Sequence, residues 1–111
     1  IEEDGTWRII GPTEPGPQPY NPGGEIAMWV SQDQGQSWLM VKEMTKGSSY
    51  NHTYARRPVN AHEDVYSCWA DGHGRQASES RLYFSRKDGT VVQLPQQMRQ
   101  SHEEPILVSP K

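Results

Sequence analysis

The sequence contains a single cysteine, Cys68, among its 111 residues. An intrachain disulfide is therefore impossible, which excludes the small scaffolds held together by disulfides. No apolar run approaches the length of about 18 residues that a membrane-spanning helix needs. The net charge of −3 is too small and too mixed to indicate binding to nucleic acid or to an anionic membrane. Three of the first four residues are acidic, and no apolar core follows them, so we expect no signal peptide in this stretch.

Apolar residues are also scarce, at 32%, whereas glycine (10) and proline (9) are frequent. The four tryptophans and five tyrosines supply much of the large apolar surface. This composition suits short strands joined by many turns better than it suits a helical bundle. No segment shows convincing helical periodicity. We therefore expect an all-β fold built from antiparallel hairpins.

The clearest element is a hairpin over residues 25–44. Two strand patterns, Glu25–Ser31 and Trp38–Met44, flank a turn that reads Ser-Gln-Asp-Gln-Gly-Gln-Ser-Trp. Asp33 can accept hydrogen bonds from backbone N–H groups of the turn, and Gly35 supplies the positive φ that such a turn needs. The tryptophan that ends the turn can fold back beneath the hairpin. Turn chemistry explains the whole octet, so we assign no catalytic role to Asp33.

Other strands flank this hairpin. A short strand is expected at Thr6–Ile10. Residues 11–24 follow it and are rich in proline and glycine. Proline at this density excludes a central strand and a helix, which leaves either a flexible linker or an ordered loop pinned by Tyr20. A closing hairpin is expected over 81–94, around an Asp-Gly turn. The tail, 96–111, either adds a last edge strand through its Ile-Leu-Val run or simply trails.

Residues 50–75 concentrate the side chains that carry chemistry. They include three of the four histidines, the only cysteine, three tyrosines and an Arg-Arg pair. One interpretation is a structural zinc site, because nitrogen and sulfur donors of this kind bind zinc tetrahedrally; the four donors are His52, His62, Cys68 and His73. Their spacing matches no CxxC or HxxxH pattern, so the fold would have to bring them together. Alternatively, Cys68 lies in a strand, Val65–Ala70, as a small buried apolar residue.

The second interpretation is a site that binds a carboxylate and moves a proton. Tyr54, Arg56 and Arg57 fall on an expected strand, Thr53–Val59. Strand alternation sends the two arginines to opposite faces and puts Tyr54 on the same face as Arg56. A guanidinium binds a carboxylate through two hydrogen bonds, and a neighbouring Tyr or His could transfer the proton. In the structural alternative, one arginine packs on an aromatic ring and the other pairs with an acidic residue nearby.

Several motifs follow one another along the chain: Gly23–Glu25 with Trp29, Ser31–Trp38, Tyr50–His62, Trp69–Arg75, Ser78–Phe84 and Gly89–Pro95. In this order they resemble the C-terminal part of Asp-box (bacterial neuraminidase repeat) proteins. The resemblance implies two to three blades of a sialidase-like β-propeller over residues 1–95. The remaining blades, or other chains, would complete the ring, and exposed strand edges would favour association. It also implies a secreted or periplasmic protein that acts on an acidic polysaccharide or glycan.

The resemblance leaves three functions open. Ulvan-type lyases of this group use His and Tyr for proton transfer and Arg to neutralise a uronate, and some carry a structural zinc. This set is similar in kind to residues 50–75, so lyase-type β-elimination is the leading expectation, with Tyr54 or His52 transferring the proton. A non-catalytic glycan-binding or structural module is the alternative, and a sialidase-type glycosidase comes third. Tyr54, Arg56 and Arg57 are at most part of a catalytic set, so whether this chain is an enzyme stays open.

Overall fold

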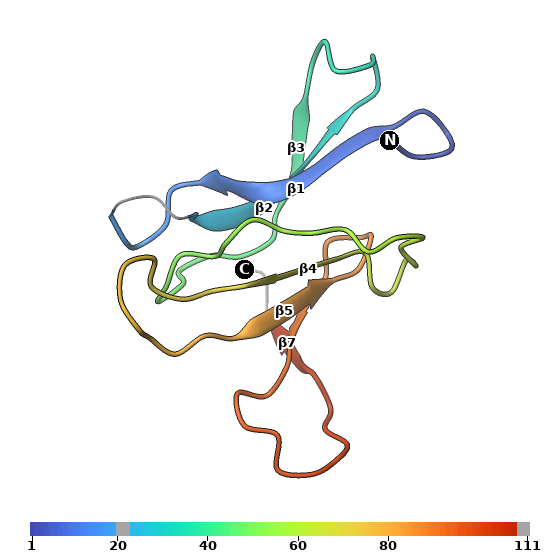
Figure 1. Ribbon diagram of the computed structural model, residues 1–111. Coiled ribbons are helices and arrows are strands. Elements are labelled where there is room, and N and C mark those ends of the chain that lie inside the picture. Colours follow the sequence, from blue (N-terminus) through green and yellow to red (C-terminus); the bar gives the residue numbers. More distant parts are fainter. Residues whose placement is uncertain (20–22, 109–111) are drawn as a thin grey trace.

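The computed structural model describes residues 1–19 and 23–108. Within these residues the chain is all-β, with two antiparallel sheets stacked one above the other (Figure 1). The first sheet has the order β1-β2-β3 and the second has the order β4-β5-β6-β7. The strands are β1 (Trp7–Glu14), β2 (Glu25–Ser31), β3 (Leu39–Glu43), β4 (Ser67–Ala70), β5 (Leu82–Ser85), β6 (Val91–Gln93) and β7 (Ile106–Val108). The described part of the chain has no helix long and apolar enough to cross a membrane.

Strand β1 is longer than the sequence predicts. It continues past Ile10 to Glu14, with a shift of register between Gly11 and Glu14. Pro12 is tolerated there because β1 lies at the edge of its sheet, where a missing N–H breaks no ladder bond on the open side. The prediction that the strand ends before the prolines is therefore wrong. Tyr20, the expected anchor of the following loop, lies outside the described residues.

The turn between β2 and β3 is held by its own side chains. The carboxylate of Asp33 accepts hydrogen bonds from the Ser37 N–H (2.8 Å), the Ser37 hydroxyl (2.5 Å) and the Ser31 hydroxyl (2.8 Å). These bonds, those from Ser37 first, lower the pKa of Asp33 to about 2. Gly35 has φ +89°, and a Cβ atom there would lie 2.8 Å from the ring of Trp7. Both the backbone angle and the space at this position thus require glycine.

The second sheet is a meander of four short strands. A turn at residues 86–90 joins β5 to β6: the Arg86 N–H donates to the Thr90 carbonyl (2.8 Å), and Gly89 has φ +90°. Beyond a mostly exposed loop, β7 returns and pairs with β6, with Val91 opposite Val108. The Ile-Leu-Val run of the tail therefore forms an edge strand.

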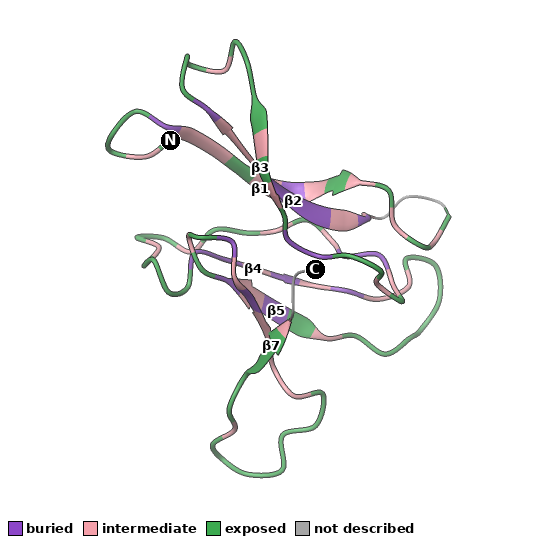
Figure 2. Ribbon diagram, turned by 180° about the vertical axis from the view of Figure 1, so that it is seen from behind, coloured by how far each residue is buried: buried purple, intermediate pink, exposed green. Residues whose placement is uncertain are grey.

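The core lies between the two sheets. Its buried members come from both of them: Ile26, Met28, Met44, Trp69, Tyr83 and Val91. Figure 2 shows buried residues gathered on β2, β4 and β5 and on the chain that runs between the sheets, whereas the hairpin tip and the loop before β7 are exposed. Burial of these side chains holds the sheets together, because each sheet alone would leave one apolar face in water.

Candidate functional site

Residues 50–64 run between the two sheets and join them (Figure 1). His52 forms isolated bridges with Gly24, next to β2, and with Asp71, next to β4. Further along, Arg56 forms one bridge with Cys68 of β4. The predicted strand Thr53–Val59 is therefore wrong: the segment touches its neighbours at single residues. Thr53 and Arg56 make backbone hydrogen bonds to β4, at Ala70 and Cys68, without forming a continuous ladder.

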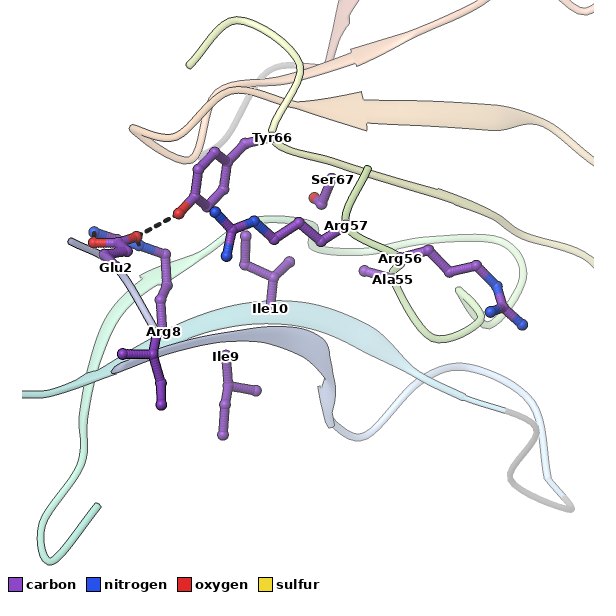
Figure 3. Close-up of a pocket in the computed structure, with 10 residues that line it drawn as sticks. Glu2, Arg8, Ile9, Ile10, Ala55, Arg56, Arg57, Tyr66 and Ser67 are labelled. Atoms are coloured by element: carbon purple, nitrogen blue, oxygen red, sulfur yellow. Dashed lines mark hydrogen bonds and ion pairs between the residues drawn. The ribbon is translucent and has the colours of Figure 1, made fainter. Parts of the chain in front are cut away.

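The two adjacent arginines nevertheless point to different sides, as strand alternation predicts (Figure 3). Arg56 turns toward Tyr54: its Nη2 donates a hydrogen bond to the Tyr54 hydroxyl (2.7 Å), and its guanidinium carbon lies 4.8 Å from the centre of that ring. Arg57 lies over the ring of Tyr66, 4.9 Å from its centre. Among residues 1–19 and 23–108, neither arginine forms an ion pair with an acidic side chain.

A cavity of about 230 Å³ lies beside Arg57 (Figure 3). Its wall combines the apolar Ile9, Ile10 and Ala55 with the polar groups of Arg8, Arg57, Tyr66 and Glu2, and with Ile1, Arg56 and Ser67. This volume is below the range of about 300–1,000 Å³ typical of drug-sized ligand pockets. The cavity therefore suits a small group, such as one sugar unit or one acidic side chain.

Glu2 lies at the rim of this cavity in a dense polar cluster. Its carboxylate accepts hydrogen bonds from the Tyr66 hydroxyl (2.5 Å) and from Arg8 Nε (2.6 Å) and Nη2 (3.1 Å), and Lys87 Nζ is 4.0 Å away. The Arg8 hydrogen bond is the main reason that the pKa of Glu2 falls to about 2. Burial, helped by the Glu2 carboxylate, raises the pKa of Tyr66, so its hydroxyl stays protonated as a donor.

His52 is buried at the contact between the sheets, with 2% of its surface exposed. The indole N–H of Trp69 donates to Nδ1 (2.9 Å), and because an indole N–H can only donate, the ring proton must lie on Nε2. Nε2 is 2.8 Å from the Ser48 hydroxyl, which in turn donates to Glu25 Oε1 (2.7 Å). Burial lowers the pKa of His52, so the ring is neutral. Both nitrogens are engaged, and substrate has no open path to either.

The buried carboxylate of Asp71 lies next to this chain of hydrogen bonds. Asp71 accepts hydrogen bonds from the Tyr83 hydroxyl (2.9 Å) and from the backbone N–H of Arg81 (2.7 Å). The Tyr83 ring meets His52 edge to face, with centres 4.8 Å apart, and stacks on Trp69 at 5.8 Å. Arg81 Nε lies 3.4 Å from the Asp71 carboxylate and forms an ion pair with it. The hydrogen bonds from Trp69 through His52 and Ser48 to Glu25 link the two sheets.

The four donors proposed for zinc do not come together. Among the described residues, no three His, Cys, Asp or Glu side chains are gathered as metal ligands. Cys68 and Trp69 alternate along β4, so the thiol lies on the face opposite the one that meets His52. His62 Nδ1 accepts the Asp64 N–H, and His73 Nδ1 accepts the Arg75 N–H, each two residues ahead in its own turn. These side chains therefore do not fit a zinc site.

Comparison with protein-family models, with curated proteins and with solved structures finds no match to this chain. The candidate site is therefore defined by its own residues alone.

Sequence reasoning missed the Glu2 cluster. Arg8 and Tyr66 belong to expected strands, and Glu2 lies in an acidic terminal stretch, so each looks like an ordinary surface residue. Glu2 and Tyr66 are 64 positions apart, and no local pattern indicates that they meet. The single usable signal was that Tyr66 lies inside the 50–75 cluster.

Proposed function

We propose that this chain is part of a carbohydrate-active β-propeller protein that acts on an acidic polysaccharide, with the two sheets as blades. Two features support the propeller: antiparallel meanders stacked face to face, and the Ser31–Asp33–Ser37 hydrogen bonds that close the hairpin turn. The sequence resemblance to Asp-box proteins points the same way. Because one fold hosts many chemistries, the reaction has to be argued from the site.

The reaction that the geometry supports best is β-elimination at a uronate. The hydrogen bond from Arg56 to the Tyr54 hydroxyl carries this proposal, because it places a cationic group next to a potential proton acceptor. One N–H group of Arg56 donates to Tyr54, and the other N–H groups of its guanidinium can bind a sugar carboxylate. Both side chains are exposed, with 60% of Tyr54 accessible, so a polymer can reach them.

The proposed step uses both residues. Arg56 neutralises the carboxylate and so makes the hydrogen on the adjacent ring carbon more acidic. The Tyr54 oxygen, as phenolate, takes that proton. The C–H electron pair becomes the new carbon–carbon double bond, and the glycosidic bond to the next sugar breaks. The departing oxygen then receives the proton from the Tyr54 hydroxyl.

His52 is the poorer candidate for the proton-transfer role. It is buried, and Trp69 and Ser48 occupy its two ring nitrogens. A group that abstracts a substrate proton must come within hydrogen-bond reach of that proton. Tyr54 meets this condition without any rearrangement of the core.

The test is the ultraviolet absorbance of unsaturated uronate when the full-length protein is incubated with a panel of acidic polysaccharides. We expect product with at least one of them, and a loss of about a hundredfold or more in rate for Tyr54→Phe and for Arg56→Gln. Arg99→Gln is the matched control, since it removes the same charge from the exposed loop before β7. If Tyr54→Phe keeps the wild-type rate, Tyr54 is not the proton-transfer group.

Non-catalytic glycan binding is the second candidate. It is favoured by the open setting of Tyr54, which lies outside the walls of the cavity beside Arg57. In that case the protein retains acidic polysaccharide on an affinity column and releases no unsaturated product. Arg56→Gln weakens the retention, whereas Tyr54→Phe does not.

A further inference from the structure

The carboxylate of Glu2 is bound in the way a ligand would be. It has 8% of its side-chain surface exposed and receives a hydroxyl donor from Tyr66 and two N–H donors from Arg8. Lys87 adds a further positive charge 4.0 Å away. Charge-assisted bonds of this kind, with a guanidinium donating through two nitrogens, are typical of carboxylate recognition.

The donors and the acceptor come from different kinds of structure. Arg8 lies on β1, Tyr66 directly precedes β4, and Lys87 lies in the turn before β6. These three donors are therefore carried by the framework of the two sheets. Glu2 belongs to a surface turn that is closed by two backbone hydrogen bonds, Glu2 N–H to Thr6 (2.8 Å) and Gly5 N–H to Glu2 (2.9 Å).

The wall of the cavity holds more positive than negative charge, because Arg8, Arg56 and Arg57 line it with the one carboxylate of Glu2. Arg57 stacks on Tyr66 without an ion pair among the described residues. The carboxylates of Glu3, Asp4 and Glu63 lie with Lys87 in the neighbouring hollow. Figure 3 shows Arg57 and Tyr66 directed toward Glu2, whereas Arg56 points the other way. The 230 Å³ cavity continues from this cluster toward Ile10 and Ala55 and leaves room for the body of a small acid.

We propose that Arg8, Tyr66 and Lys87 form a binding site for a ligand carboxylate, which Glu2 fills as an internal substitute until a ligand displaces it. The class of ligand, an acidic sugar, rests on the proposed function. The existence of the site rests on the contacts of Glu2 alone. This site is separate from the Tyr54–Arg56 pair, so one polymer could engage both.

Displacement requires only rotation of the Glu2 side chain. The backbone of the turn makes its own hydrogen bonds and can stay in place. A tethered carboxylate competes at a high effective concentration, of millimolar order for a short flexible link. A free ligand therefore binds the wild-type protein weakly, and removal of Glu2 exposes the full affinity of the site.

Calorimetric titration of the full-length protein with glucuronate, and with glucose as the neutral comparison, tests this proposal. We expect Glu2→Ala and Glu2→Gln to bind glucuronate at least about tenfold more tightly than the wild type, because Arg8 and Tyr66 regain a charged acceptor. We expect no binding of glucose to the wild type or to either variant. Glu3→Ala is the matched control: it removes an exposed carboxylate from the same turn and from the same surface hollow, so any general effect of charge appears there too.

Two results would overturn the proposal. One is that Glu2→Ala binds glucuronate no better than Glu3→Ala. The other is that the gain survives Arg8→Gln in the Glu2→Gln background. Thermal melts of each variant identify any loss of folding, and Glu2→Gln keeps the size of the side chain while it removes the charge and one acceptor oxygen. The titration measures binding without catalysis, so it tests the Glu2 site even if the Tyr54–Arg56 pair has no lyase activity. If the protein is an active lyase but the Glu2 variants bind glucuronate no more tightly, the proposed binding site is refuted and the proposed function is not.

Discussion

Acidification should loosen the contact between the two sheets through His52. At neutral pH its Nδ1 accepts the Trp69 N–H, and its Nε2–H points to Ser48. Protonation places an N–H on Nδ1 opposite the indole N–H, so two donors face each other in the core. The buried cation also loses its hydration. Glu25 and Asp71 offset part of this cost, but burial prevails and the pKa of His52 lies below its usual value.

The sign and the upper limit follow from proton linkage. An unfolded histidine titrates near pH 6.5, whereas folded His52 titrates at a lower pH, so the unfolded state binds more protons in between. The contribution of His52 to stability is therefore complete above about pH 6.5 and falls as the pH drops toward its folded pKa. One proton of difference changes the free energy of unfolding by at most about 1.4 kcal/mol per pH unit.

Urea unfolding followed by tryptophan fluorescence measures this slope. We expect the titration of His52 to cost the wild type up to about 1 kcal/mol between pH 6.5 and pH 5.5, because an unfolded histidine is already half protonated at pH 6.5. The free energy of unfolding of His52→Gln should fall less over the same interval, because the contribution of this one proton is absent. Glutamine can accept a hydrogen bond from Trp69 and donate one to Ser48 without titrating. The control is His62→Gln, which replaces a histidine whose side chain is 76% exposed. An acid slope in His52→Gln equal to that of the wild type would refute the reasoning.

Three further substitutions test the hairpin turn and the core, each by chemical or thermal denaturation. Gly35→Ala should cost more than about 1 kcal/mol, because φ is +89° and the new Cβ meets the ring of Trp7; an unchanged midpoint would show that the turn relaxes freely. Tyr83→Phe should cost about 1–3 kcal/mol, since it leaves the buried carboxylate of Asp71 without its hydroxyl donor, and a neutral result would mean that another donor replaces it. Asp33→Ala should lower the melting temperature by a few degrees and leave any lyase rate unchanged; a selective loss of activity would contradict a purely structural role.

The hairpins could be predicted because their determinants lie within a few residues of one another. The Asp33 carboxylate reaches Ser37, four positions away, and Gly35 and Gly89 have the positive φ that the turns need. Strand alternation also predicted correctly that Arg56 lies with Tyr54 and apart from Arg57. Each of these features depends on local geometry, which a short stretch of sequence contains in full.

The metal interpretation shows where this kind of reasoning stops. Closeness along the chain suggested that four donors in the 50–75 segment might converge. In the structure, His62 and His73 close their own turns, and Cys68 lies on the opposite face of β4 from the side that meets His52. Whether donors converge depends on how a segment runs between two sheets, and the spacing of residues contains no information on that path.

The sequence by itself determined that the chain is all-β, where its hairpins turn and which neighbours alternate, because these follow from proline, glycine and hydrogen bonds over a few residues. Only the tertiary structure decided that His52 is a neutral link in the core and that Glu2 meets Arg8 and Tyr66. Those contacts join positions as many as 64 residues apart. They form when burial of apolar side chains stacks one sheet on the other, so they depend on the whole core and not on any one segment.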